Sequence, residues 1–462
     1  MTAFAAHRVQ LSQSFPPPRE QSSGDGRGQC PHTLYQTDMM GDALVWGSQQ
    51  HVSSISECCA ACAAYRPKNG TAGARCNAWV YCGNKSLCGT SYGECWLKYL
   101  PYVELFGLRR NQPRWTSGFM PMSEHEADGR EEPDPSPDRS YHTMVTAQGT
   151  AVHWQSRIGY YWFLKVRKAC REAGPCEMGG FTRVLHSGQA DDLMDEIPTF
   201  VANPLPPEHP NHGYIVLNRP YAVMQWIRQV KIKEKYVLMS EPDHIWLKPM
   251  QNLMEARHPA AAPYFYIRTG HTKYLDLVRS FLTQDLTQEQ AEHIAPIGNS
   301  PTLMHWDDLA LVAPVWFNMS LAVHNNEVAV KEWNWVQEMY AFTMSLWKAG
   351  IRRVDLKPEM MGQPPWDADV TKYHILHYTY SQEFDADGRH TPGKDTAFFV
   401  FNKRRFWKLP IPRNMTNIPE ASTNTMTRQL IDAFNEATSH IPDWDEYAKT
   451  GVAKKIWDGT FA

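Results

Sequence analysis

The stretch YVLMSEPDHIWLKP, residues 236–249, places charged side chains where a buried strand should end. Residues 237–239 form an apolar run typical of an interior strand, and Glu241, Asp243 and His244 follow it. An unpaired charge near a core is costly, so these acids need an explanation. Carboxylates at a strand end of an α/β sheet suit a hard cation, Mn²⁺ or Mg²⁺, that also binds substrate phosphates. An ordinary polar strand end is the alternative interpretation.

The spacing of the two acids requires a turn. Glu241 and Asp243 are two residues apart, so both reach one site only if Pro242 turns the chain. Proline is disfavoured inside a central strand and tolerated at its end, which favours a turn here.

Two histidines later in the chain could complete a metal site. His374 and His377 lie in the β-rich run YHILHYTYSQEF, residues 373–384, at an odd spacing that places them on opposite faces. One of them can therefore point to the active edge while the other packs. A neutral imidazole is an acceptable third ligand for Mn²⁺ beside carboxylates, although His377 alone would fit a core histidine equally well.

Composition and charge exclude some classes of partner. The chain has 462 residues, of which 42% are hydrophobic and 21% charged, and its net charge is −3. This balance gives no global electrostatic support for binding nucleic acid. We interpret the one compact basic cluster, residues 403–405, as a solvated face or a local anion contact.

Cysteine usage predicts an oxidising compartment. Eight of the ten cysteines are crowded into a short segment, which is typical of a small disulfide-stapled domain, whereas a zinc cluster would need paired C-x₂-C knuckles. They are Cys30, Cys58, Cys59, Cys62, Cys76, Cys82, Cys88 and Cys95. Cys170 and Cys176 predict a further disulfide that closes a short loop. Four sequons, at Asn69, Asn84, Asn318 and Asn414, fit a secretory protein.

The sequence lacks an apolar run of about 18 residues and a leader-like N-terminus. Nothing in the sequence as written therefore targets the chain to the secretory pathway. Because the cysteines indicate an oxidising compartment, we nevertheless expect a protein of the Golgi or secretory-pathway lumen whose leader or membrane anchor is absent from this chain.

Changes in composition and apolar patterning along the chain predict four parts. Residues 1–27 are expected to be a flexible tether, 28–105 a cysteine-rich module, 106–140 an acidic, Pro-rich linker, and 141–462 a large α/β domain. In the last part, apolar runs at 142–147, 181–187, 214–218 and 235–240 alternate with helical patterns. The clearest helix spans 153–170, with Trp154, Ile158, Trp162 and Val166 on one face, and a last helix is expected near 428–439. This alternation predicts a mostly parallel sheet with ligands at the carboxyl ends of its strands.

The cysteine-rich module resembles the PAN/Apple family. The matching segments are ISECCAACAAY, CNAWVYC and CGTSYGECWLK, within residues 30–98. The resemblance implies a small α+β fold that binds protein or carbohydrate, or that serves only as a spacer.

From residue 141 to about 444 the chain resembles the plant and green-algal hydroxyproline O-arabinosyltransferases. Matching blocks, in order, include HWQSRIGYYW, GGFTRVLHSGQADDLMDEIPTFV, GYIVLNRPYAVMQW, YVLMSEPDHIWLKPMQNL, PIGNSP, WNWVQEMYAF, QPPWD, ILHYTY and PRNMT. The resemblance implies a Golgi enzyme with a nucleotide-sugar (GT-A type) fold. Its reaction would move arabinofuranose from UDP-β-L-arabinofuranose to the hydroxyl of hydroxyproline in extended, Pro-rich proteins.

The resemblance also implies roles for individual residues. Asp243 and His377 would hold the metal, while Glu241 would bind it, reach it through water or contact the ribose. The cation would stabilise the departing diphosphate as a Lewis acid. Thr146 and Ala147 would lie beside the uracil and ribose. Basic partners for the diphosphate would be Arg157, Arg183, Arg219 and Lys394, each of which could instead be a surface or ion-pair residue.

The sugar site would combine polar groups with an apolar wall. Asn299 and Ser300, expected on a glycine turn, would supply hydrogen bonds, and Trp335 and Trp366 the wall. Glu338 and Asp367 are the carboxylates expected near the anomeric carbon. With inversion, one of them would act as general base. With retention, which the family implies, the leaving phosphate could take the proton.

Other functions remain open on the sequence alone. Galactose transfer to peptidyl serine, or another UDP-sugar transfer, is the nearest enzymatic alternative. A non-catalytic carbohydrate- or matrix-binding protein is the alternative from another class, and a metal-dependent hydrolase lacks a second ligand cluster. The module could also add a second contact with the acceptor polymer.

Overall fold

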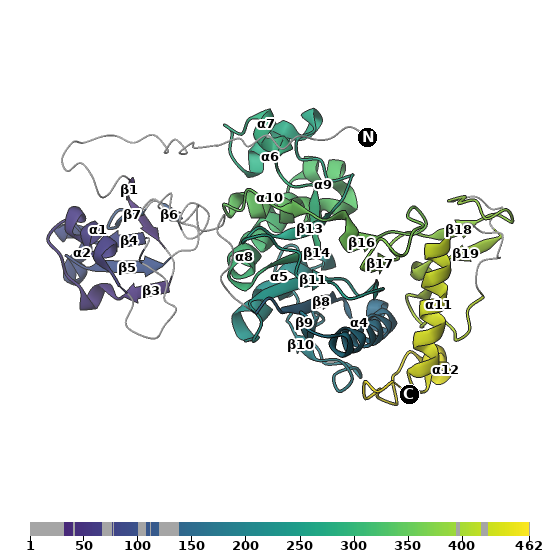
Figure 1. Cartoon of the computed structure of the whole chain (residues 1–462). Helices are drawn as coiled ribbons and strands as arrows, with labels where there is room; N and C mark the ends of the chain where they lie inside the picture. Colours follow the sequence, from purple (N-terminus) through teal and green to yellow (C-terminus); the bar gives the residue numbers. More distant parts are fainter. Residues whose placement is uncertain are drawn as a thin grey trace. The chain divides into compact units, whose positions relative to one another are not determined.

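A computed structural model describes residues 32–39, 42–66, 76, 78–99, 108–110, 112–119, 138–393, 398–416 and 424–461. They divide into two compact units, residues 1–126 and residues 127–462 (Figure 1). The predicted tether, most of the predicted linker, Cys30, Asn69 and Lys394 lie outside the described residues. No helix of the described residues is long and apolar enough to span a membrane.

The first unit is a disulfide-stapled antiparallel sheet that carries helix α1 (Ile55–Ala64). Its strand order is β1 (His32–Tyr35), β7 (Thr116–Phe119), β4 (Ala78–Tyr81), β5 (Cys95–Tyr99) and β3 (Asp42–Val45). A second pair joins β2 (Thr37–Met39) to β6 (Leu108–Arg110), and α2 (Lys85–Cys88) follows β4. Disulfide Cys58–Cys95 ties α1 to β5, and Cys62–Cys76 ties α1 to the residue two positions before β4. Cys82–Cys88 closes the segment that contains α2, and Cys59 is also disulfide-bonded.

The predicted end of this module near residue 105 was wrong. Strand β7 pairs with both β1 and β4 in the same sheet, so the module extends to Phe119 and includes residues that we expected in the linker. Composition does not reveal this extension, because β7 is short and follows a polar stretch.

The second unit contains a seven-stranded mixed sheet that confirms the predicted α/β class. Its order is β10 (Thr199–Val201), β9 (Met178–Leu185), β8 (Tyr141–Ala147), β11 (Tyr236–Ser240), β14 (Ile297–His305), β13 (Ala260–Pro263) and β15 (Asp355–Leu356). The first four strands run parallel, and β13 is parallel to β15, whereas β14 is antiparallel to both neighbours. Two small sheets accompany it: β12 (His244–Trp246), β17 (Ile375–His377) and β16 (Met361–Gly362), and the pair β18 (Gln382–Phe384) and β19 (Phe399–Phe401).

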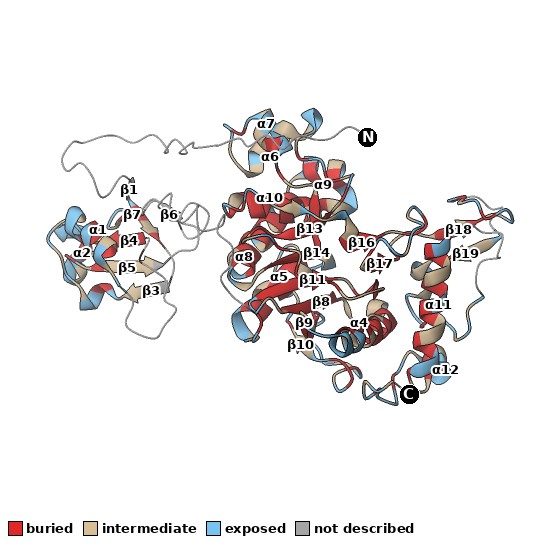
Figure 2. Ribbon diagram, viewed as in Figure 1, coloured by how far each residue is buried: buried red, intermediate tan, exposed pale blue. Residues whose placement is uncertain are grey.

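Helices cover the large sheet, and most of the residues in its strands are buried (Figure 2). The helices of the described part of this unit are α4 (His153–Ala173), α5 (Asn218–Gln229), α6 (Leu275–Phe281), α7 (Gln288–Glu292), α8 (Trp306–His324), α9 (Glu327–Trp333), α10 (Gln337–Lys348), α11 (Thr425–His440) and α12 (Trp444–Thr450). Of these, α4, α5, α8 and α10 pack against strands of the large sheet. The predicted face of α4 is confirmed: Trp154, Ile158, Trp162 and Val166 are all buried.

The apolar run at 214–218 is not a strand. It forms a short 3-10 helix (Ile215–Leu217) that continues into α5. Pro220 lies in the first turn of α5, where its missing N–H costs nothing, and this favours a helix start at the end of the run.

Several surface predictions can be placed. Asn84, Asn318 and Asn414 are exposed, as glycosylation sites must be. Cys170 and Cys176 form the predicted disulfide.

Two arginines predicted to bind the diphosphate are each paired with a carboxylate. Arg157 donates to Glu196 through Nε at 2.7 Å and Nη2 at 2.6 Å, and both side chains are fully buried. Arg183 makes a similar two-bond pair with Asp191, at 2.8 and 2.6 Å. Both guanidiniums are engaged by these carboxylates, so the contacts favour structural roles and give no support to the predicted contacts with the diphosphate.

The Arg157–Glu196 pair predicts a stability effect. Arg157→Met leaves Glu196 buried without its partner and should lower the free energy of unfolding by about 3–5 kcal/mol. Urea unfolding measures this loss. Arg171→Met, which removes an exposed arginine from the same helix, is the control and should change the free energy of unfolding little; an equal loss in both variants would contradict the structural role.

Candidate functional site

The acids of the strand end lie on a tight turn, as predicted. Strand β11 ends at Ser240, and the N–H of His244 donates to the carbonyl of Glu241 at 3.2 Å. His244 then opens β12, which pairs antiparallel with β17 and places His244 opposite His377. The turn and this pairing bring together residues that lie more than 130 positions apart.

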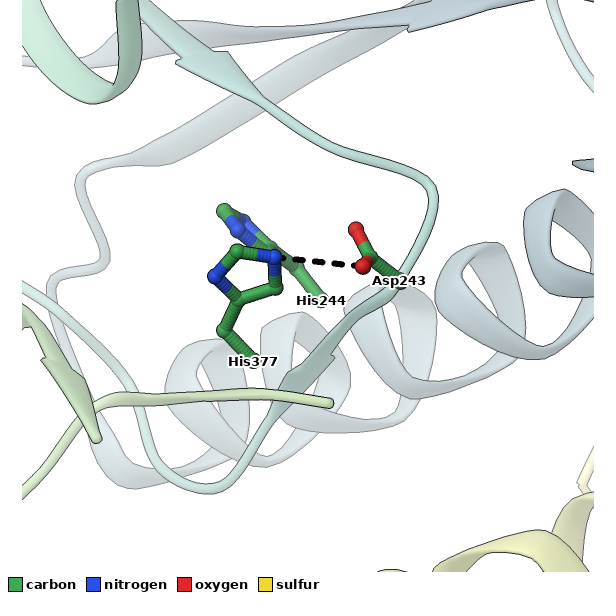
Figure 3. A group of neighbouring side chains, drawn as sticks. All are labelled: Asp243, His244 and His377. Atoms are coloured by element: carbon green, nitrogen blue, oxygen red, sulfur yellow. Dashed lines mark hydrogen bonds and ion pairs between the residues drawn. The ribbon is translucent and has the colours of Figure 1, made fainter. Parts of the chain in front are cut away.

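Asp243, His244 and His377 form a buried cluster (Figure 3). Asp243 Oδ2 lies 3.1 Å from His377 Nε2, and one potential ligand atom from each of the three residues lies within 4.8 Å of the others. The predicted pair Asp243 and His377 therefore share one site. His374 binds the carbonyl of Pro249 instead, which confirms that the two histidines of this run have different roles.

The cluster offers donor atoms that could hold a divalent transition cation. His377 Nδ1 and His244 Nε2 are buried without a hydrogen-bond partner among the described residues. His244 Nδ1 is fixed by Ser240 Oγ at 2.8 Å and by the N–H of Glu241 at 3.3 Å. One carboxylate and two imidazoles with unsatisfied nitrogens fit Mn²⁺. Glu241 lies outside this group, and His244 was not among the predicted ligands.

Lys403 supplies the positive charge nearest to Asp243. Its Nζ contacts Asp243 Oδ2, and its side chain is only 18% exposed. Burial alone would raise the pKa of Asp243, but the charges of Lys403 and His377 outweigh it and hold that pKa well below its usual range. We interpreted residues 403–405 as a solvated face or a local anion contact; Lys403 makes a local anion contact, and the anion is the carboxylate of Asp243. Because Lys403 and Asp243 are 160 positions apart, no local sequence pattern indicates that they are in contact.

Arg219 links two further carboxylates beside the cluster. Its guanidinium donates to Glu338 at 2.9 Å and to Glu241 at 3.1 Å. Burial, with the charge of Glu241, raises the pKa of Glu338 to about 7, although Arg219 opposes this shift. One arginine cannot neutralise two buried carboxylates fully. Arg219 and Glu338 were predicted site residues, and the structure brings them together beside Glu241.

The neighbouring strand ends contribute unsatisfied polar atoms. Thr146 and Ala147 end β8 and are buried, and Thr146 Oγ1 has no partner in the described part of the chain. His186 follows β9, donates its N–H to the carbonyl of Ala147 and has an unpartnered Nε2. Burial, together with the charge of Arg219, lowers the pKa of His186 to about 3, so its imidazole is neutral. Sequence reasoning missed His186, although its position directly after a strand was a usable signal.

Asn299 and Ser300 are buried in strand β14, so the predicted glycine turn was wrong. Gly298 stays extended, and the side chain of Met339 occupies the space that a Cβ would fill. Met239 pairs with Thr302, and the antiparallel register therefore brings the start of β14 to the carboxyl end of β11. Ser300 Oγ is buried without a partner among the described residues.

The predicted apolar wall is exposed rather than enclosed. Trp335 and Trp366 are 63% and 64% exposed. Asp367 accepts from the N–H of Gln363 and from the Tyr373 hydroxyl, both at 2.8 Å. These contacts hold a turn and favour a structural position for Asp367, so of the two carboxylates predicted near the anomeric carbon only Glu338 contacts Arg219 beside Glu241.

The raised pKa of Glu338 predicts a pH dependence of stability. Because the folded-state pKa of about 7 lies above the ordinary value of 4.5, its contribution is full below about pH 4.5 and is lost as pH rises through about 7. Glu338→Gln should remove about 3 kcal/mol of this decline in the free energy of unfolding between about pH 5 and pH 8. Urea unfolding in EDTA measures it. Exposed Glu289→Gln should keep the wild-type profile, and an unchanged profile in Glu338→Gln would contradict the shift.

Comparison with known proteins identifies the family. Models of the hydroxyproline O-arabinosyltransferase family match twice, the N-terminal domain at residues 141–356 and the C-terminal domain at 374–445. Hydroxyproline O-arabinosyltransferase 1 of Arabidopsis thaliana is 45% identical over 308 residues, which cover 66% of this chain and 81% of that protein.

Two further relatives extend the comparison. Hydroxyproline O-arabinosyltransferase RDN1 of Medicago truncatula is 40% identical over 335 residues, 71% of this chain and 90% of that protein. Peptidyl serine alpha-galactosyltransferase of Arabidopsis thaliana is 24% identical over 310 residues, 61% of this chain and 35% of that protein. The chain therefore belongs to the hydroxyproline O-arabinosyltransferase family.

Proposed function

We propose that this protein is a glycosyltransferase that moves L-arabinofuranose from UDP-β-L-arabinofuranose to the hydroxyl of peptidyl hydroxyproline. The family and the names of the relatives at 40–45% identity support the reaction. The observation that carries the proposal is the cluster of Asp243, His244 and His377 at the carboxyl end of β11, beside the end of β8.

The cluster residues would hold Mn²⁺ or Mg²⁺, which when bound supplies Lewis-acid neutralisation of the leaving diphosphate. The chain adds positive charge of its own through Arg219 and Lys403, which contact Glu241 and Asp243 of the turn at 241–244. A guanidinium that is held in place, such as that of Arg219, needs little reorganisation during the reaction, so it stabilises a departing anion more than solvent does.

Buried polar atoms without partners would be satisfied by the donor. Thr146 Oγ1, His186 Nε2 and Ser300 Oγ are such atoms at the ends of β8 and β9 and in β14. Buried polar groups are costly when unsatisfied, so a polar ligand that bonds them gains affinity and orientation. We assign the first two to the nucleoside and Ser300, with Asn299, to the sugar.

Glu338 is the carboxylate that we place near the anomeric carbon. Its Oε1 is buried without a partner in the described structure, while Oε2 accepts from Arg219. In the retaining reaction that we propose, the ionised carboxylate stabilises oxocarbenium-like charge, and the leaving phosphate takes the proton of the acceptor hydroxyl.

The acceptor would be an extended, proline-rich polypeptide in the polyproline II conformation. Such segments dock on exposed aromatic side chains. Trp335, whose ring lies 5.8 Å from that of Tyr266, and Trp366 are exposed and fit this role better than that of a sugar wall. The first unit would be a PAN/Apple-type module that adds a second contact with the same polymer, and the second unit a GT-A-type domain.

The disulfides support an oxidising compartment, and we propose the lumen of the Golgi apparatus. Transfer of galactose to peptidyl serine is the second candidate, favoured by the 24% match to the peptidyl serine enzyme.

A donor and acceptor screen tests the function. With Mn²⁺, the purified protein should transfer arabinofuranose from UDP-β-L-arabinofuranose to hydroxyproline peptides, detected by mass spectrometry, and should leave serine peptides unmodified with any UDP-sugar. Transfer of galactose to serine peptides would favour the second candidate, and loss of all transfer with either donor would contradict both.

The metal assignment has its own test. Asp243→Asn keeps the volume but removes the charge that a cation needs, so turnover should fall by at least about a thousandfold and Mn²⁺ should no longer raise the melting temperature. Exposed Asp307→Asn is the control and should keep both properties. Turnover near the wild-type rate in Asp243→Asn would contradict the assignment.

A further inference from the structure

The ammonium group of Lys403 and the imidazole of His377 share one oxygen of Asp243. Lys403 Nζ contacts Oδ2, and His377 Nε2 lies 3.1 Å from the same atom. Asp243 is only 5% exposed, so this oxygen has little access to solvent. A cation that binds Asp243 Oδ2 and His377 must therefore compete with Lys403.

The backbone that carries Lys403 is anchored on both sides. Lys403 opens the 3-10 helix Lys403–Phe406, and the side chain of Asn402 caps it by accepting from the N–H of Arg404 at 2.9 Å. Phe401 is buried before this helix, and Trp154 Nε1 donates to the carbonyl of Phe406 at its end, at 2.9 Å. Movement of Lys403 is therefore a change of its side chain and not of the segment.

Electrostatic repulsion would displace the Lys403 side chain from Asp243 when a cation binds there. A lysine ammonium and a divalent cation repel each other at one carboxylate, strongly so where water is scarce. Lysine carries a compact charge on a flexible four-carbon stem, so it can move to a second anion without a change in the backbone. Lys403 Nζ also lies 5.9 Å from the ring of Tyr378, whose hydroxyl is buried without a partner among the described residues.

We infer that Lys403 is a positioning residue with two alternating partners. Without a cation it neutralises Asp243, and once a cation takes Asp243 it turns to the diphosphate of the donor. This inference rests on the proposed function, because the second partner is the nucleoside diphosphate. It makes cation and nucleotide binding depend on each other, since each ligand moves Lys403 in the direction that favours the other.

The inference predicts opposite effects of one substitution. Lys403→Met removes the competitor of the cation, so the full-length protein without nucleotide should bind Mn²⁺ about tenfold more tightly. The same variant lacks the contact with the diphosphate, so UDP in saturating Mn²⁺ should bind about tenfold more weakly. Isothermal titration calorimetry with Mn²⁺ alone, and with UDP in Mn²⁺, measures both without turnover. Lys403→Arg keeps the charge and should stay near wild type in the first titration.

Arg404→Met is the matched control, because it removes a neighbouring charge that is exposed. It should leave both affinities within about twofold of wild type. Weaker or unchanged Mn²⁺ binding in Lys403→Met, or unchanged UDP binding, would overturn the inference, and thermal unfolding of each variant verifies that it is folded. If the wild-type protein bound neither Mn²⁺ nor UDP, the proposed function itself would fail.

Discussion

The site depends on a carboxylate, Asp243, that is kept ionised in a place where burial opposes its charge. Its pKa stays low because Lys403 and His377 face it from segments far along the chain. Burial makes each contact stronger than it would be in water, and it would make the loss of either contact costly. The chain is thus folded so that three distant segments meet around one negative charge.

The large sheet provides the frame for this meeting. Parallel strands β9, β8 and β11 end at the same edge, so the residues that follow them converge there. Antiparallel β14 then brings Asn299 and Ser300 to that edge from the opposite direction. The buried ion pair Arg157–Glu196 holds α4 against its surroundings. Arg219 and Lys403 have a different role, because they pair with the carboxylates of the site.

Sequence reasoning identified what local patterns encode. The apolar run before Glu241, the turn at Pro242 and the amphipathic face of α4 each depend on neighbouring residues, and each was predicted correctly. The odd spacing of His374 and His377 also assigned one imidazole to the site.

Contacts between distant segments could not be predicted in this way. In the sequence, Arg157 does not differ from other helical arginines, because its partner Glu196 lies 39 positions away. Lys403 reads like a surface lysine for the same reason, and the end of the first module depended on where β7 pairs. His244 was recognised in the motif, but only its pairing opposite His377 makes it a potential ligand.

We propose that Asp243 and His377 together hold the cation that accompanies the nucleoside diphosphate. Anomalous diffraction at the manganese edge, from crystals of the protein with Mn²⁺ and UDP, tests it most directly. We expect a single strong peak at bonding distance from Asp243 Oδ2 and from a nitrogen of His377, next to the phosphates. A peak elsewhere, or ordered UDP whose phosphates lie away from this cluster, would contradict it.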